Sequence, residues 1–510
     1  MGDAIRRAPT ASMRAISRDR FGEGEARHLL WRAGFGGTDA QIATLAEWGP
    51  ERAVDHLLDV DNAAGYPGVR SDAFDAGVIR EFTREEQRAY RMALQQGDEA
   101  AVARFRGLRE SMQRADRDQM RSVQRWWLTR MIESSRPLEE KMTLFWHGHF
   151  ATSYRTVENS YHMFLQNQLF RSHALGNFGD LLFRIIRDPA MLKYLNNDRN
   201  FRASPNENLA RELMELFALG EGQYQERDIR EGARALTGYT YSGNEFVFDA
   251  NRHDDGQKQI LGTSGNLNGD DFVKAILARR ACSDFIATKL YRWFVVDDIP
   301  ARGTPARASM ERVIRDLSGA LRRHRYEIKP MLRMLFLSEH FYDSANRHMQ
   351  IKSPAELVVG TVRSLHTPVR DLNTLLDAME LMGQRLFFPP NVAGWAGGRA
   401  WINTSTVFVR QNTTAFLLTG MTPGSGPALT ERAYDPAMAI RDFVTRRPEA
   451  ARDPERMAGR LLEVMLGMEI GGARRESVAR VLGADGNPLS NDGILQAMML
   501  ISAMPEYQLC

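Results

Sequence analysis

Residues 204–239 carry the pattern that decides the fold class, and they read SPNENLARELMELFALGEGQYQERDIREGARALTGY. In the first half, apolar residues recur at the spacing of one helix face, at Leu209, Leu213, Leu216 and Phe217. Gly220 to Gly222 interrupts this pattern, and Gly238 ends the next helical stretch. The segment therefore predicts two helices in succession.

After Gly238 the helical pattern gives way to alternation. Residues 239–248 read YTYSGNEFVF, which predicts a small β-hairpin that turns at Ser242-Gly243-Asn244. We expect a mainly α protein, a large multi-helix globular domain with this one small hairpin as an insertion.

Helical signals also dominate the rest of the chain. Residues 80–135 are rich in charge and contain no proline, and the break at Gly97-Asp98 predicts a long helical hairpin with a solvated face. Further helices are expected at 270–296, from Pro305 with Thr304 as cap, and at 354–383. No internal repeat or low-complexity linker divides the chain. We expect a flexible segment at 1–20 and a single large helical domain at 21–510.

The composition is that of an ordinary globular protein. The 510 residues include 67 Lys and Arg and 64 Asp and Glu. This small excess of positive charge disfavours nucleic-acid binding. Two cysteines cannot form a disulfide framework. Neither a signal-peptide core nor a transmembrane run of about 18 apolar residues is visible. The sequence favours a soluble, cytoplasmic protein, or one exported together with a signal-bearing partner.

The helix expected from Ser204 presents carboxylates beside its apolar stripe. Glu207 lies three residues after Ser204, which predicts a capping box. Asn208, Glu212 and Glu215 fall on one side of the helix, where carboxylates need a compensating cation. A metal is one such cation. Arg211, four residues from both Glu207 and Glu215, offers a purely structural alternative.

His147 and His149 end a second amphipathic stretch, which begins near Pro137. On a continuing helix the two side chains diverge by about 200°, whereas a helix end at Gly148 lets them converge. A ligand or catalytic role for at least one of them competes with a structural role in the core.

The loop that follows the hairpin is polar and contains His253, Asp254 and Lys258. Histidine and aspartate are ligands that zinc, iron or manganese use. The same residues also suit an ordinary turn, since Asp and Gly supply turn chemistry.

Two other segments have both structural and functional interpretations. Asp228, Glu231 and Arg234 form a charged helix face that is capped at Gly238. Trp395 and Trp401, in a Pro/Gly-rich loop, suit either a pocket wall or a plug in a helical core.

Several of these motifs together resemble the bacterial family catalogued as domain of unknown function 1800. The run HLLWRAGFG at 28–36 and the run PEYQL at 505–509 match its ends. Between them lie the other matching runs: FWHGHF at 145–150, NENLARELMELFALG at 206–220, DIREGARALTG at 228–238, HDDGQKQILG at 253–262 and PPNVAGW at 389–395.

The resemblance implies frequent pairing with a companion, a domain-of-unknown-function 1501 protein that is similar to sulfatases and alkaline phosphatases and often bears a twin-arginine signal. Two positions depart from the family pattern. Gly148 stands where a polar residue is frequent, and Phe217 stands where the family run has histidine. The second departure weakens the case for a shared metal site.

Two functions compete. The first is a metal-dependent enzyme, hydrolytic or oxidative, in which a divalent cation is held by a set of side chains that converge in one pocket: His147 or His149, Glu212, Glu215, and His253 or Asp254. A Glu or Asp of this set serves as general base, and Arg211 or Lys258 stabilises developing negative charge. The alternative is a non-catalytic accessory protein for the sulfatase-like companion, in which the polar motifs form a buried structural network. The sequence leaves the substrate, the metal and the oligomeric state open.

Overall fold

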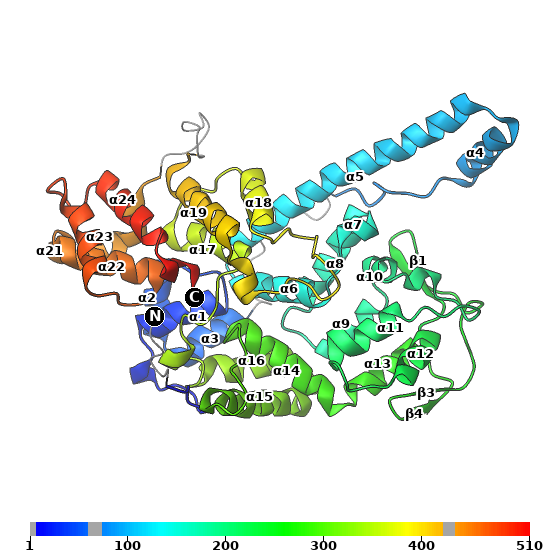
Figure 1. Ribbon diagram of the computed structural model, residues 1–510, viewed down its shortest axis with the longest axis horizontal. Helices are drawn as coiled ribbons and strands as arrows, with labels where there is room; N and C mark the ends of the chain where they lie inside the picture. The colour runs from blue at the N-terminus through cyan, green and yellow to red at the C-terminus, as the bar shows by residue number, and fades with distance from the viewer. Residues whose placement is uncertain (1–6, 60–73, 422–433) are drawn as a thin grey trace.

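The structure, a computed structural model, describes residues 7–59, 74–421 and 434–510. Within these ranges the chain folds into helices α1 to α24 and two small antiparallel sheets of two strands each (Figure 1). The prediction of a mainly α fold is confirmed.

The N-terminal part forms three short helices: α1 (Glu23–Arg32), α2 (Asp39–Trp48) and α3 (Pro50–Leu58). Thr38 caps α2, because its hydroxyl accepts a hydrogen bond from the Gln41 amide at 3.2 Å. The segment that precedes α1 runs beside residues 337–343. There the amides of Glu339 and His340 donate to the carbonyls of Arg14 and Ser12 at 2.8 and 3.0 Å.

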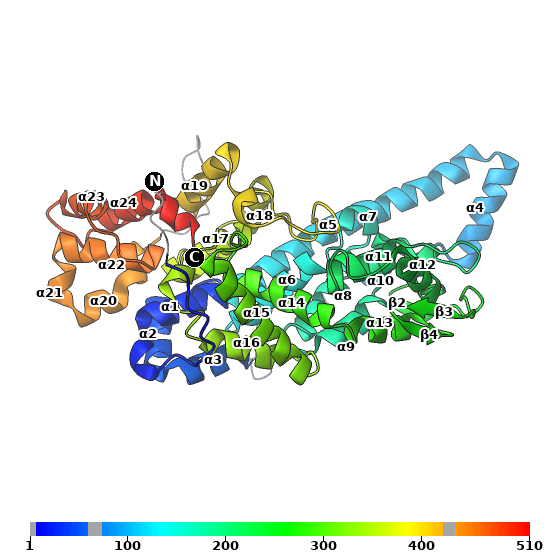
Figure 2. The ribbon, with the colours of Figure 1, turned by 60° about the horizontal axis from the view of Figure 1, so that its bottom comes forward.

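A long helical hairpin projects from the body of the molecule (Figures 1 and 2). It consists of α4 (Arg84–Gln96) and α5 (Glu99–Glu133), and the chain reverses at Gly97-Asp98 as predicted. Gly97 takes the left-handed conformation, and the Asp98 carboxylate caps α5 by accepting from the Ala101 amide at 2.9 Å.

The central part of the chain forms a series of mostly short helices. They are α6 (Pro137–His149), α7 (Tyr154–Val157), α8 (Ser160–Ser172), α9 (Phe178–Ile185), α10 (Pro189–Tyr194), α11 (Asn208–Glu212), α12 (Glu226–Ala235), α13 (Gly269–Leu277), α14 (Arg280–Phe294), α15 (Pro305–Arg323) and α16 (Ile328–Leu337).

The C-terminal part is also helical, and residues 382–403 join its second and third helices. The helices are α17 (Pro354–Leu365), α18 (Leu372–Leu381), α19 (Thr404–Thr419), α20 (Arg441–Arg446), α21 (Pro448–Ala451), α22 (Pro454–Leu466), α23 (Ala473–Gly483) and α24 (Asn491–Ser502).

The predicted helix at Ser204 differs from the observed one. Helix α11 begins at Asn208, so the expected capping box is wrong. Instead, the Asn206 amide donates to the Asn200 side chain at 2.9 Å, and the Asn206 side chain accepts from the Asn208 amide at 3.0 Å. After Glu212 the backbone widens into a π-helical segment, η4 (Leu213–Ala218), in which the Leu219 amide donates to the Met214 carbonyl five residues back. Such π segments occur frequently at functional sites.

The predicted hairpin is present as β1 (Tyr239–Ser242) and β2 (Glu245–Phe248), with Ser242 paired to Glu245 across the turn. A second hairpin, β3 (Lys258–Ile260) and β4 (Thr263–Gly265), was not predicted. Its turn residues Leu261 and Gly262 both have positive φ, at 48° and 86°. Because leucine rarely adopts this conformation, the residues at this turn are not an ordinary turn signal.

Helix α6 lies between two groups of buried apolar residues. Its residues Leu138, Met142 and Phe145 belong to a group formed mainly by α1 to α3 and by the helices up to α16. Leu144, on another face of α6, belongs to a group that includes α5 and α17 to α24. The end of α6, with both histidines of the FWHGHF motif, therefore lies near the junction of the two groups.

Candidate functional site

A cavity of about 310 Å³ opens beside the C-terminal half of α6. Three parts of the chain form most of its wall: α6, the end of α14 with the residues after it, and the loop that carries the PPNVAGW motif. Their lining residues include Phe145, His149, Lys289, Trp293, Asp297 and Trp395. Two motifs that are far apart in the sequence thus contribute to one site.

Aromatic rings make up much of the cavity wall. The rings of Phe145 and Trp293 lie 5.6 Å apart, and the Phe145 ring stacks on that of His149 at 5.7 Å. Trp395 and Trp401 line the cavity as well, which agrees with the pocket-wall interpretation of these tryptophans. Such surfaces suit a ligand with a flat apolar face.

His149 presents a free acceptor nitrogen. Its side chain is buried, and its Nε2 lies 2.9 Å from the carbonyl oxygen of Phe217, to which it donates. Its Nδ1 is buried and has no hydrogen-bond partner among the described residues. Burial lowers the pKa of His149 to about 3, so the ring is neutral near pH 7 and Nδ1 bears a lone pair.

Two donors on α14 line the same cavity. The buried indole Nε1 of Trp293 has no hydrogen-bond partner within the described ranges. Lys289, one helical turn earlier, places its ammonium 5.3 Å from the centre of the Phe285 ring. Burial, followed by the charge of Arg292, lowers the pKa of Lys289. The lysine therefore provides a partly desolvated positive charge at the cavity.

Asp297 supplies a carboxyl group that titrates near neutral pH. It follows α14, and its Oδ2 accepts a hydrogen bond from the Ile351 amide at 2.7 Å. Burial, assisted by the negative charge of Glu356, raises the pKa of Asp297 to about 6. Near pH 6, both the proton-donating and the proton-accepting form of this group are well populated.

A buried ion pair lies next to the cavity. Lys141 on α6 contacts the carboxylate of Glu356 on α17, and the lysine side chain is only 1% exposed. The Lys141 ammonium also lies 5.5 Å from the centre of the Trp293 ring. Glu356 lines the cavity, so this pair connects α6 to α17 at the cavity wall.

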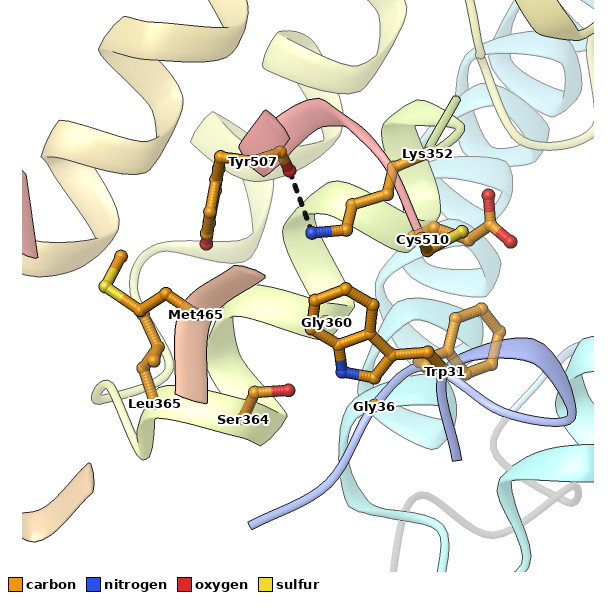
Figure 3. Close-up of a pocket in the computed structure, with 11 residues that line it drawn as sticks. Trp31, Gly36, Lys352, Gly360, Ser364, Leu365, Met465, Tyr507 and Cys510 are labelled. Atoms are coloured by element: carbon orange, nitrogen blue, oxygen red, sulfur yellow. Dashed lines mark hydrogen bonds between the residues drawn. The ribbon is translucent and has the colours of Figure 1, made fainter. Parts of the chain in front are cut away.

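Glu356 also lines a second, much smaller cavity, which is shown in Figure 3. Here Lys352 donates to the Tyr507 carbonyl at 2.8 Å, and its ammonium lies 4.3 Å from the centre of the Trp31 ring. The free space is about 20 Å³, which holds about one water molecule. This region therefore joins the HLLWRAGFG and PEYQL motifs, and it is too small for an organic ligand.

The two glutamates predicted as catalytic or metal-binding lie together near the surface. Glu212 and Glu215 are partly buried, and burial followed by the charge of Glu215 raises the pKa of Glu212. The Tyr224 hydroxyl donates to Glu215. Arg211 pairs with Glu207 at 3.0 Å, as the structural alternative predicted, and with Glu226 at 2.6 Å rather than with Glu215.

The two histidines of the FWHGHF motif point in different directions because α6 remains helical through Gly148. The Nε2 of His147 accepts a hydrogen bond from the Phe387 amide at 3.1 Å, and the ring packs against Trp127 and Trp395. Burial lowers the pKa of His147 to about 3. His147 is absent from the residues that line the cavity.

The polar side chains of the loop after the first hairpin form hydrogen bonds and an ion pair with nearby residues. His253 donates from Nδ1 to the Thr237 carbonyl at 2.8 Å, and Asp254 pairs with Arg234 at 2.7 Å. The hydrogen bond from Arg234 holds the pKa of Asp254 at about 2. Lys258 is buried and donates to the carbonyls of Asp254 and Gly256. Each of these polar groups has a partner within its own segment or on the end of α12.

The structure therefore brings Glu212 close to Glu215, and His149 close to the backbone of η4, while the other predicted site residues have separate partners. Across residues 7–59, 74–421 and 434–510, no three His, Cys, Asp or Glu side chains form a group that could hold a metal ion. The same ranges contain no helix with the length and apolarity that a membrane span requires.

The sequence analysis missed Lys289, Trp293 and Asp297. One signal was available, because these residues follow one another at intervals of four, as residues on one helix face do. That pattern alone does not distinguish a cavity wall from an ordinary helix face. Only the packing of α14 against α6 shows that these three residues line a cavity.

Comparison with known proteins identifies a family without assigning an activity. No curated protein and no solved structure matches the chain significantly. A family model described as protein of unknown function (DUF1800) matches residues 28–509. This match covers all the motifs from HLLWRAGFG to PEYQL, and the chain therefore belongs to the DUF1800 family.

Proposed function

We propose that the protein is an enzyme that binds a small molecule in the cavity beside α6 and uses Asp297 for proton transfer. One observation carries this proposal. His149 and Trp293 both line this cavity, and the Nδ1 of His149 and the Nε1 of Trp293 are buried without a hydrogen-bond partner among the described residues. Buried polar groups are normally paired, and a bound ligand is the simplest way to satisfy an acceptor and a donor that line one aromatic-walled pocket.

The reaction that suits these groups best is hydrolysis. Cleavage of an ester, amide or glycosidic bond needs a group that gives a proton to the leaving atom or takes one from water. Asp297, with a pKa of about 6, can do either near neutral pH. His149 is too weak a base for this task, but its free Nδ1 can accept a hydrogen bond that orients a hydroxyl group of the ligand.

A divalent metal remains a prediction from the sequence. A neutral imidazole with a free nitrogen, as in His149, is the form that binds metals. Glu212 and Glu215 remain proposed ligands, and the metal content of the purified protein would test them. The roles proposed for Asp297 and Trp293 do not depend on the outcome of that measurement, since neither residue belongs to the predicted metal ligands.

A panel of chromogenic esters, phosphate monoesters and glycosides would test the proposal. We expect hydrolysis of at least one class, and we expect Asp297→Asn to reduce the rate about 10²–10⁴-fold, the usual contribution of a general acid or base. Asp316→Asn is the control, because this carboxylate is exposed on α15 and does not line the cavity. Equal activity of both variants would contradict the role of Asp297.

The helical hairpin α4–α5 favours a second candidate function, the accessory role. This hairpin projects from the body (Figures 1 and 2), and its exposed residues include Arg104 and Arg106. Such a projection offers a surface to another protein, and the family resemblance suggests the sulfatase-like companion. Loss of co-purification with that companion in an Arg104→Glu/Arg106→Glu variant, with enzyme activity unchanged, would support this role.

A further inference from the structure

The cavity contains a positive charge that the described residues leave uncompensated. Lys289 lines the cavity, is only partly exposed to solvent, and has no hydrogen bond or ion pair with any residue that the structure describes. Its ammonium contacts the face of the Phe285 ring, 5.3 Å from the ring centre. A cation–π contact compensates only part of the hydration that such a group loses.

The carboxylates of the same cavity are already engaged elsewhere. Glu356 pairs with Lys141, Asp298 pairs with Arg399 at 3.1 Å, and Asp297 accepts the Ile351 amide at 2.7 Å. Arg292, near Lys289 on the same helix, adds a second positive charge to the lining and directs its guanidinium to a backbone carbonyl, that of Asp297. Lys289 therefore lacks a counter-ion within the described part of the protein.

The remaining surface of the cavity is suited to a ring. Phe145, Trp293, Trp395 and Trp401 provide aromatic faces and edges, while Gly148 and Gly397 leave space between them. The volume of about 310 Å³ is at the lower end of the usual range for small-molecule pockets, about 300–1,000 Å³. A ligand of one ring or two fits this size better than an extended chain.

From this arrangement we infer that the ligand is a small organic anion: a ring that stacks on the tryptophans and bears an anionic group that pairs with Lys289. The inference rests on the proposed function of the cavity and specifies its substrate class. The anionic group replaces the missing counter-ion, and the ring covers the aromatic wall. Both an aromatic acid and a sugar acid have this chemistry, because each bears a carboxylate and can stack on an indole, the first through its flat ring and the second through the C–H face of its pyranose ring.

The test uses matched pairs of probes on the full-length protein. Isothermal titration with benzoate and benzamide compares an anionic with a neutral aromatic ring, and glucuronate with glucose makes the same comparison for a sugar. We expect the anion of one pair to bind at least about tenfold more tightly than its neutral counterpart, a difference of about 1.4 kcal/mol. The pair that shows the difference identifies the kind of ring.

Variants of Lys289 then assign this preference to the lysine. Lys289→Gln is expected to reduce the anion-to-neutral affinity ratio to about one, whereas Lys289→Arg retains the charge and most of the preference. Lys274→Gln is the matched control, because Lys274 is an exposed lysine on α13 that does not line the cavity. Circular dichroism and thermal melting establish that each variant is folded.

The possible failures are distinguishable. Equal binding of the anionic and neutral probes, or a preference that survives Lys289→Gln, would overturn the inference and leave the cavity as a ligand site. Failure of all four probes to bind would overturn the inference as well, and it would also count against the cavity as the place where a ligand binds.

Discussion

Gly394 lies against the backbone of Gly148, so that a Cβ atom on residue 394 would lie 2.2 Å from the Gly148 carbonyl oxygen. This contact joins the PPNVAGW loop to the end of α6. Because Gly394 also has a φ of +79°, a side chain there would meet both backbone strain and a steric clash. The position of Trp395 in the cavity wall depends on this close approach.

The first prediction follows from that contact. Gly394→Ala should destabilise the protein by about 1–3 kcal/mol more than Gly397→Ala, as expected for forced overpacking. Gly397 has a similar φ of +73°, but a Cβ atom there would meet no described atom within 4 Å, so it controls for the backbone strain alone. Urea denaturation of both variants measures the difference. Equal destabilisation would mean that the loop moves to relieve the clash.

The second prediction concerns the pH dependence of stability. Because the pKa of Asp297 is raised to about 6 from 3.8, the folded protein binds this proton more tightly than the unfolded chain. The stabilisation is therefore present below about pH 4 and is lost as the pH rises to about 6. The Asp297→Asn variant has no such titration. As the pH rises from 4 to 8, its free energy of unfolding should therefore increase relative to that of the wild type by up to about 3 kcal/mol.

Thermal melting across this pH range would test the effect of Asp297. Asparagine can still accept the Ile351 amide through its side-chain oxygen, so the local hydrogen bond is retained. A constant difference between the variant and the wild type at all pH values would show that Asp297 titrates at its ordinary pKa.

The third prediction concerns the ion pair between Lys141 and Glu356. Glu356→Gln leaves the buried Lys141 without a counter-ion and should cost about 3–5 kcal/mol. The Lys141 charge holds the pKa of Glu356 below its ordinary value of 4.5 despite burial. Its contribution to stability is therefore present above about pH 4.5 and is lost as the pH falls further.

An exposed ion pair of the same protein provides the control. Arg307 and Glu311 lie one helical turn apart on α15 with their charged atoms 2.6 Å from each other. Because solvent screens this pair, Glu311→Gln should cost much less stability than Glu356→Gln. Chemical denaturation at pH 7 measures both variants, and similar losses would indicate that Lys141 finds another partner or becomes neutral.

The fourth prediction concerns Glu212. Arg211 pairs with Glu207 and Glu226, so Glu212 is not half of an ion pair with that arginine. Burial and Glu215 already raise the pKa of Glu212, and Glu212→Gln should therefore change the free energy of unfolding by no more than about 1 kcal/mol. Metal analysis of the wild type and the variant decides the role. A metal that is present in the wild type and lost from the variant would support the predicted metal site, and a wild type without metal would count against it.

The sequence by itself determined the helical fold and many of its boundaries. The break at Gly97-Asp98, the cap at Thr38 and the hairpin at 239–248 were predictable because each depends on residues close together in the chain. The family motifs were also recognisable, and they drew attention to His149 and Trp395, which line the cavity. Local chemistry was sufficient for all of these.

Tertiary structure decided where those motifs lie and which polar groups remain without partners. His149 and Asp297 are far apart in the sequence, and they line one cavity because α14 and the 389–401 loop pack against α6. The pKa of Asp297 and the missing counter-ion of Lys289 both result from burial among distant segments, which no local pattern in the sequence encodes.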